Sequence, residues 1–159
     1  MPTVQERLAE LGIELPAVAA PLAAYVPATR TGHLVFTAGQ LPLVNGSLLA
    51  TGIVGADVDV ETAARCARQC ALNGLAAVHS LIGDLDDVVR VVKVVGFVAS
   101  TPQFTGQPAV VNGASTLLGE VFADAGVHAR SAVGVSSLPM GAPVEVEMVV
   151  EVTGSGSGG

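Results

Sequence analysis

Apolar and polar residues alternate with two different periods along this chain, and the two periods predict strands and helices. Between residues 143 and 153 every second residue is apolar, and glutamates lie on the opposite face, which predicts a half-buried strand. Residues 88–98 are almost entirely apolar and β-branched, as is typical of a central strand buried on both faces. Shorter patterns predict strands at 34–37, near 47–49 and at 130–138, with an Asn-Gly turn between the first two.

Three segments have the 3.6-residue spacing of helices. Residues 3–11 predict a short N-terminal helix. A long helix is expected over residues 59–80, where the side chain of Asp59 can cap its first turn and mostly small residues form its apolar face. Pro108 is suited to the first turn of a second long helix, which Gly126 is expected to end.

The order of these elements is strands, helix, strand, helix, strands, which fits a two-layer α+β domain with both long helices on one sheet face. The second sheet face would then be bare in a monomer. Half of the 159 residues are hydrophobic, only 13% are charged, and the mean hydropathy is +0.62. The uncharged stretches are too short or too interrupted to span a bilayer. We therefore expect the surplus apolar surface to be covered by self-association, with no membrane partner.

The charge balance disfavours nucleic-acid binding. The chain has 7 Lys and Arg against 14 Asp and Glu, for a net charge of −7, and no basic cluster. Cys66 and Cys70 are one helical turn apart and are expected to be buried thiols, because no further Cys or His at short spacing completes a metal site. No secretory pattern is seen at the N-terminus, so a cytoplasmic location is expected.

Arg130 is the residue that most directly suggests chemistry. It opens an apolar strand pattern in a chain with few cations. A guanidinium is always charged and carries five donors, so at the edge of a core it requires an anion. That anion could be an internal carboxylate such as Glu145 or Glu147, or the carboxylate of a bound substrate. The residues alone leave both readings open.

Several short segments, in matching order, make the chain resemble the RidA/YjgF family. They include an Ala-Gly-Gln-Leu-Pro segment, an Ala-Arg-Ser-Ala-Val segment, a Leu-Pro pair and a Val-Glu-Val-Glu strand. The matching segments are 25–26, 36–42, Asn73, 92–94, 111–112, 129–133, 138–139 and 144–147. The resemblance covers about residues 20–152, with the long N-terminal lead typical of a less-studied branch.

This resemblance implies a fold, an assembly and an activity. The family has the chorismate-mutase-like fold and forms homotrimers with a central barrel and active sites at the subunit interfaces. It hydrolyses reactive 2-imino or enamine acids to 2-oxo acids and ammonia, with no metal or organic cofactor. By position, Arg130 would hold the substrate carboxylate and Glu145 would position or activate water. Tyr25, Gly39 and Asn112 match the remaining substrate-binding positions.

Some positions depart from the family pattern. Ala132 stands where a cysteine is frequent, Ala38 replaces a frequent serine, His128 replaces a common proline, and Gly134 replaces a common glutamate. His33 and His128 are not spaced as a metal-binding pair. These changes keep Arg130, which would hold the substrate carboxylate, but they bear on substrate choice and turnover.

The chain is therefore divided into an N-terminal helical lead (1–19), a RidA/YjgF-like domain (20–153) and a Gly/Ser-rich linker or tag remnant (154–159). Two alternatives to an imine deaminase remain open. One is a non-catalytic binder of small carboxylates that uses the same arginine. The other is an engineered trimeric building block, paired with a second protein component. Ribonuclease activity is disfavoured by the acidic balance and by the missing His/Lys catalytic cluster.

Overall fold

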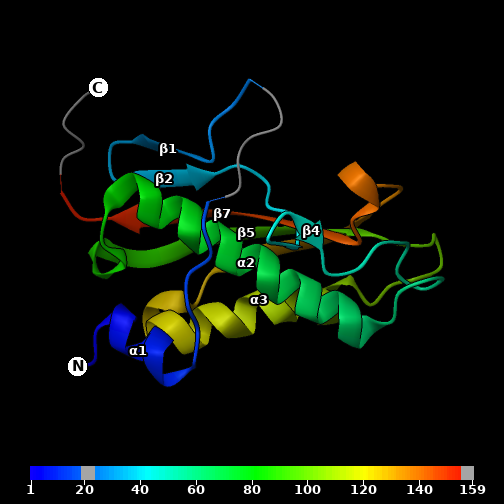
Figure 1. Cartoon of the computed structure of the whole chain (residues 1–159), viewed down its shortest axis with the longest axis horizontal. Helices are drawn as coiled ribbons and strands as arrows, with labels where there is room; N and C mark the ends of the chain where they lie inside the picture. Colours follow the sequence, from blue (N-terminus) through cyan, green and yellow to red (C-terminus); the bar gives the residue numbers. More distant parts are fainter. Residues whose placement is uncertain (19–23, 155–159) are drawn as a thin grey trace.

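A five-stranded sheet with two long helices against one face organises the chain (Figure 1). The computed structural model describes residues 1–18 and 24–154. The elements are α1 (Val4–Glu10), β1 (Ala28–Thr31), β2 (Leu34–Thr37), β3 (Leu43–Val44), β4 (Ser47–Leu48), α2 (Val60–Ile82), η1 (Leu85–Asp87), β5 (Val88–Ala99), α3 (Gln107–Phe122), η2 (Ala123–Gly126), β6 (Ala129–Val135), η3 (Pro139–Gly141) and β7 (Val144–Val152). The predicted boundary at residues 19 and 20, and residues 155–159 of the predicted tail, lie outside the described residues.

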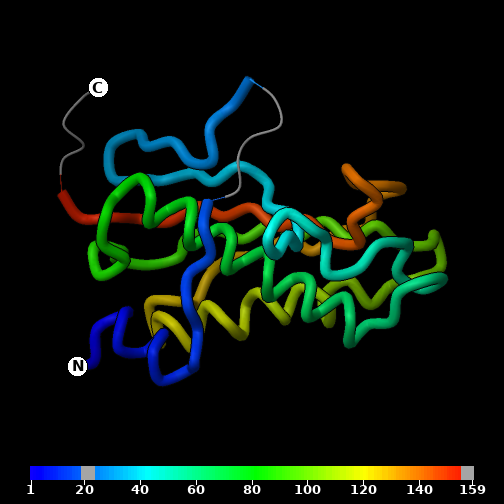
Figure 2. Tube along the Cα trace, in the orientation of Figure 1, coloured from blue at the N-terminus to red at the C-terminus, as the bar shows by residue number. Residues whose placement is uncertain are grey.

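The sheet has the order β1-β2-β7-β5-β6, so its two edges are β1 and β6. Strands β5 and β6 run parallel and are joined through α3, whereas the other neighbours are antiparallel. Figure 2 shows the last strand, β7, running between β2 and β5, which are far from it in sequence. The predicted two-layer α+β arrangement with both long helices on one face is confirmed.

The core lies between this sheet and the helices α2 and α3. In β7, buried and partly buried residues alternate through all nine positions, which confirms the predicted half-buried strand. In β5, Val94 and Val98 are fully buried against the helices, while Val95 and Phe97 on the other face are only partly buried. The predicted burial of β5 on both faces is therefore absent from the single chain, because the long helices cover one face alone.

Local signals fix the ends of the long helices. The carboxylate of Asp59 accepts a hydrogen bond from the backbone N–H of Thr62, and Gly83 ends α2 with a φ of 84°. Helix α3 begins at Gln107 with Pro108 in its first turn, as predicted. It ends at Phe122, earlier than predicted, because the segment to Gly126 tightens into the 3-10 helix η2.

The strand predictions needed three corrections. Strands β1 and β3 were not predicted. The Asn45-Gly46 turn joins β3 to β4 in a separate two-stranded sheet, whereas β2 pairs with β1 and β7. The strand predicted at 130–138 ends at Val135, because the chain turns before Pro139 and Met140 takes a φ of 61° in η3.

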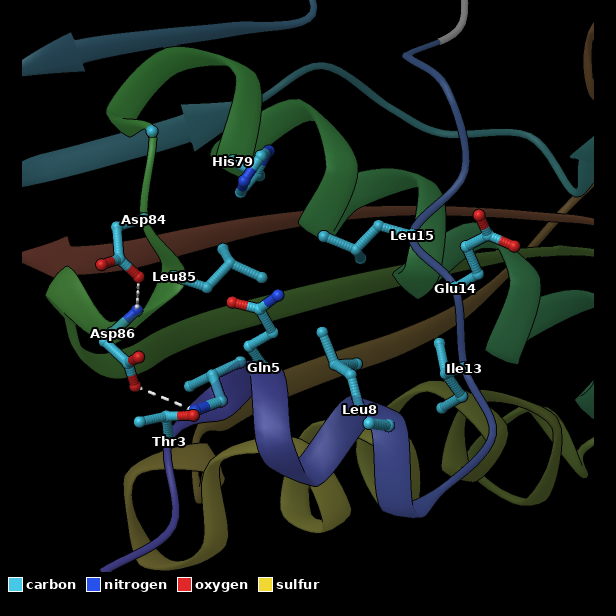
Figure 3. A pocket seen from close by; sticks show the side chains of 13 residues that line it. Thr3, Gln5, Leu8, Ile13, Glu14, Leu15, His79, Asp84, Leu85 and Asp86 are labelled. Carbon is cyan, nitrogen blue, oxygen red and sulfur yellow. Dashed lines mark hydrogen bonds between the residues drawn. The ribbon is translucent and has the colours of Figure 1, made fainter.

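The N-terminal helix α1 packs against α3 and η1. Thr3 and Glu6 form a reciprocal capping box, and the side chains of Val4 and Leu8 are buried. The backbone N–H of Val4 donates to a carboxylate oxygen of Asp86 at 2.9 Å. Between α1 and the end of α2 lies a half-open cavity of about 640 Å³ (Figure 3). Within the described residues, no helix has the length and apolar character needed to cross a membrane.

Candidate functional site

Arg130 lies near the start of the edge strand β6, and its side chain turns toward α3. In register it faces Val94 of β5, a fully buried residue on the helix-covered side of the sheet. Its Nη1 atom donates to Asn112 Oδ1 at 2.7 Å and to Ser115 Oγ at 3.2 Å. Its Nη2 atom lies 3.4 Å from the carbonyl oxygen of Pro108. Two of the predicted site residues, Arg130 and Asn112, are therefore in direct contact.

These contacts leave one edge of the guanidinium available. Both hydrogens of Nη1 are used by Asn112 and Ser115, whereas Nε has no acceptor among the described residues and Nη2 makes only one long contact. The edge formed by Nε and Nη2 is planar and can donate two parallel hydrogen bonds to one carboxylate. In the described part of the chain neither Glu145 nor Glu147 forms an ion pair with Arg130.

A second layer of contacts, which the sequence did not predict, holds Ser115. His128 Nε2 lies 2.9 Å from Ser115 Oγ, and His128 Nδ1 lies 2.7 Å from the carbonyl oxygen of Gly126. A shallow hollow of about 320 Å³ adjoins this network. The i, i+3 spacing of Asn112 and Ser115 was a signal that both occupy one face of α3. The parallel pairing of β6 with β5, which brings His128 to that face, was not readable from the sequence.

Glu145 and Gly39 form a second group, on the other face of the sheet. Glu145 faces Phe97 of β5, which is on the side away from the helices. A Cβ atom on Gly39 would lie only 2.8 Å from the Glu145 carboxyl carbon, so the absence of a side chain at Gly39 is what allows this approach. Burial, and secondly the charge of Glu147, raises the pKa of Glu145. A carboxyl with a raised pKa can hold or return a proton more readily near neutral pH.

Tyr25 belongs to neither pair. Its side chain is 49% exposed, and it precedes β1, the edge of the sheet opposite to β6. The backbone N–H of Ala38 donates to the carbonyl of Pro27, so the chain two residues after Tyr25 lies beside the residue that precedes Gly39. Within one chain the five predicted site residues thus form two separate pairs and one isolated residue.

The sheet face that carries Glu145 is open and mixes apolar residues with the charged residues Glu147 and Lys93. The exposed residues on it include Phe36 and Val133, and a small hollow of about 210 Å³ lies between Phe36, Lys93 and Glu147. Lys93 donates to Ser131 Oγ at 3.2 Å across this face. A single chain leaves the surface uncovered, as the arrangement of predicted elements implied.

The cysteines are buried and unbridged, as predicted. Burial raises the pKa of both thiols, well above the usual range at Cys70, so neither is suited to act as a nucleophile. Among the described residues, no group of three or more His, Cys, Asp or Glu side chains could hold a metal ion.

The sequence is similar to known proteins over nearly all of its length. Residues 5–152 match the family described as "YjgF/chorismate_mutase-like, putative endoribonuclease". Protein TCP17 of Trypanosoma cruzi is 46% identical over 150 residues, which cover 94% of each chain. The crystal structure of Atu1372 from Agrobacterium tumefaciens, described as a protein with unknown function, shares 48% identity with a TM-score of 0.87, over 96% of this chain and 94% of that one. A "putative endoribonuclease" from Shewanella oneidensis shares 32% identity with a TM-score of 0.92, over 95% and 100%.

Proposed function

Since this chain belongs to the YjgF/chorismate mutase-like family, we propose that it hydrolyses reactive 2-imino acids, and their enamine tautomers, to 2-oxo acids and ammonia. In this reaction water adds to the C=N carbon, a proton goes to the nitrogen, and the C–N bond of the resulting tetrahedral carbon breaks as C=O forms. One water is consumed for each ammonia released, and no electrons are exchanged. The protein must therefore bind a carboxylate, position a water molecule and transfer protons to and from the reacting groups.

The Nε–Nη2 edge of Arg130 carries this proposal, because its one contact among the described residues is the 3.4 Å contact from Nη2 to the carbonyl of Pro108. All imino and oxo acids of this class share a carboxylate beside the reacting carbon, and that edge offers it two parallel donors. Asn112 then contributes by holding Nη1, so it acts on the substrate through Arg130.

Glu145 supplies the proton chemistry in this proposal. Its raised pKa supports a role in taking a proton from the attacking water and returning one to the departing nitrogen. Gly39 supports this role of Glu145 because it has no side chain. It leaves room for the Glu145 carboxyl group, and its own backbone can lie close to the ligand.

The proposed site is shared between chains of a homotrimer. Arg130 with Asn112 comes from one chain, and Glu145 with Gly39 and Tyr25 comes from its neighbour. Two observations support this arrangement: the two groups lie on opposite sheet faces in one chain, and the Glu145 face is open and exposes apolar residues such as Phe36 and Val133. Packing three such faces together gives the central barrel that we propose.

An assay with 2-iminopropanoate and 2-iminobutanoate, generated in situ by an amino acid oxidase, tests the function. We expect ammonia release to accelerate over the uncatalysed rate with the wild-type protein and to return to that rate with Arg130→Ala. A wild-type protein that binds a 2-oxo acid in calorimetry without accelerating imine hydrolysis would support the non-catalytic carboxylate binder instead.

Two other readings make different predictions. An engineered building block would form particles larger than a trimer when mixed with a second protein component. Endoribonuclease activity, named in the description of the family, would require RNA to approach a chain with a net charge of −7. We therefore rank endoribonuclease activity below deaminase activity. The proposed location of the deaminase is the cytoplasm.

A further inference from the structure

We infer that Ser115 and His128 are positioning residues that fix the orientation of the Arg130 guanidinium, an inference that rests on the proposed carboxylate-binding role of Arg130. The network is continuous from the backbone to the guanidinium. It runs from the carbonyl of Gly126 through His128 and Ser115 to Arg130, with contacts of 2.7, 2.9 and 3.2 Å.

The direction of each hydrogen bond follows from the groups involved. The carbonyl of Gly126 can only accept, so Nδ1 of His128 carries the hydrogen of that contact. In the uncharged ring Nε2 is then the acceptor, and Ser115 donates its hydroxyl hydrogen to it. The lone pairs of Ser115 Oγ are left to accept from Nη1 of Arg130. Each polar atom along this line has one consistent role.

His128 matters because a hydroxyl group can rotate. If nothing accepted the hydrogen of Ser115, that hydrogen could turn toward Arg130 and displace the Nη1 hydrogen bond. The ring of His128 prevents this, and it is itself held at both nitrogens. Gly126, which anchors the ring, is buried and tightly packed: a Cβ there would collide with the backbone carbonyl of Leu118.

The consequence is a guanidinium held from one side only. Asn112 and Ser115 lie one turn apart on α3 and take both hydrogens of Nη1, which sets the plane of the group. The Nε–Nη2 edge is then presented in one orientation before a ligand arrives. Such preorganisation lowers the entropy lost when a carboxylate binds.

Ser115→Ala and Ser115→Thr form the matched pair for the test, in the full-length protein. Alanine has the higher helix propensity, so Ser115→Ala should fold at least as well as the wild type, while Ser115→Thr keeps the hydroxyl. His128→Phe removes both ring nitrogens, and His128→Gln keeps an acceptor for Ser115. Two readouts are used: the order of the Arg130 Nε–H group by ¹⁵N relaxation, and the affinity for 2-oxobutanoate by calorimetry.

We expect Ser115→Ala and His128→Phe to increase the mobility of the Arg130 Nε–H group. We also expect them to weaken 2-oxobutanoate binding by about twofold to tenfold, because they act on the ligand only through the orientation of the guanidinium. Ser115→Thr and His128→Gln should recover most of both effects. In an Arg130→Lys background, Ser115→Ala should cause no further loss of affinity, because its effect passes through the guanidinium.

The outcomes separate this inference from the proposed function. Unchanged Nε–H order in both Ser115→Ala and His128→Phe overturns the inference, whatever the activity. Equal losses of affinity in the wild-type and Arg130→Lys backgrounds also overturn it. Increased Nε–H mobility in a protein that hydrolyses no imine supports the inference while the deaminase proposal fails.

Discussion

The side chains of Arg130 and Glu145 leave the sheet on opposite faces. Arg130 is in register with Val94 of β5, and Glu145 is in register with Phe97 of the same strand. Positions 94 and 97 are an odd number of residues apart, and side chains alternate along a strand, so the two point to opposite sides. A close-packed sheet lets no side chain through. A site that contains both groups must therefore take them from different chains.

Mixing two inactive variants tests this shared site. Arg130→Ala and Glu145→Gln are each expected to abolish most imine hydrolysis. When both chains are co-expressed, some interfaces pair an intact Arg130 with an intact Glu145 from the neighbour. Random assembly of a trimer gives such an intact site at about one quarter of the interfaces, so about one quarter of wild-type activity should return.

The control is to mix the two variants after each has assembled alone, under conditions where subunits do not exchange. That mixture should stay inactive. Co-expressed chains that form mixed trimers by mass spectrometry yet remain inactive would show that both groups act from one chain, and the shared site would be rejected.

The sequence predicted best those features that depend on neighbouring residues. The alternation in β7 gave that strand its limits within one or two residues, and Asp59 marked the start of α2 through its own hydrogen bond to Thr62. The sequence predicted poorly those strands that form only by pairing with distant segments. Strand β1 has little apolar character and exists because it pairs with β2, and β3 consists of two residues fixed by a turn.

The candidate site also contains features that local sequence predicts and features that depend on distant pairing. Arg130 was singled out because a cation beside an apolar run requires an explanation, and it contacts Asn112, another of the residues proposed for the site. The roles of Ser115 and His128 were not predictable, because they arise only when β6 lies alongside α3. The separation of Arg130 from Glu145 is a property of strand register, which motif order does not contain.

Arg130→Lys should weaken the binding of a 2-oxo acid even though the charge is kept. Lysine presents a point charge, whereas the guanidinium offers two parallel donors and also satisfies Asn112. The expected loss is about 1.5–3 kcal/mol, or roughly tenfold to a hundredfold in Kd. Calorimetric titration measures it. An affinity equal to that of the wild type would mean that Arg130 has a structural role.

Glu145 should make the stability of the fold depend on pH. Its pKa is raised by burial and then by the charge of Glu147, so the folded chain binds this proton more tightly than the unfolded chain. The contribution is therefore present below the ordinary glutamate pKa and is lost as the pH rises through the folded-state pKa. Glu145→Gln should raise the midpoint of thermal unfolding at neutral pH and remove this part of the acid-side pH dependence.

The same substitution should act on catalysis in the opposite direction. Glutamine cannot exchange a proton with water, so imine hydrolysis should fall by about a hundredfold or more, the usual contribution of a general acid–base group. If Glu145→Gln is both more stable and inactive, the carboxyl group of Glu145 serves catalysis at a cost in stability. A Glu145→Gln protein that is less stable at neutral pH would contradict the proposed cause of the pKa shift.

Gly39→Ala should impair activity through Glu145. The added Cβ would lie 2.8 Å from the Glu145 carboxyl carbon, which is too close, so the carboxyl group must move. Activity should fall, and overpacking should reduce stability by about 1–3 kcal/mol. In a Glu145→Ala background the same change should cost much less stability, because the obstructing group has gone. Equal losses of stability in both backgrounds would mean that Gly39 is needed for its backbone conformation and not to make room for Glu145.

Two glycines of α3 give opposite expectations for one substitution. A Cβ on Gly113 would collide with the backbone carbonyl of Ala64 on α2, so this glycine lets the long helices approach each other. A Cβ on Gly119 would meet nothing within 4 Å. Gly113→Ala should therefore destabilise the fold by about 1–3 kcal/mol, since backbone atoms cannot rotate away. Gly119→Ala should stabilise it by about 0.5–1 kcal/mol through helix propensity.

Urea unfolding of the two glycine variants at one fixed protein concentration measures both effects, because assembly makes stability depend on concentration. The pair controls for the general benefit of alanine in a helix, which both variants share. If Gly113→Ala were as stable as Gly119→Ala, the helices would have room to separate. The contact between Gly113 and Ala64 would then not limit how closely α2 and α3 pack.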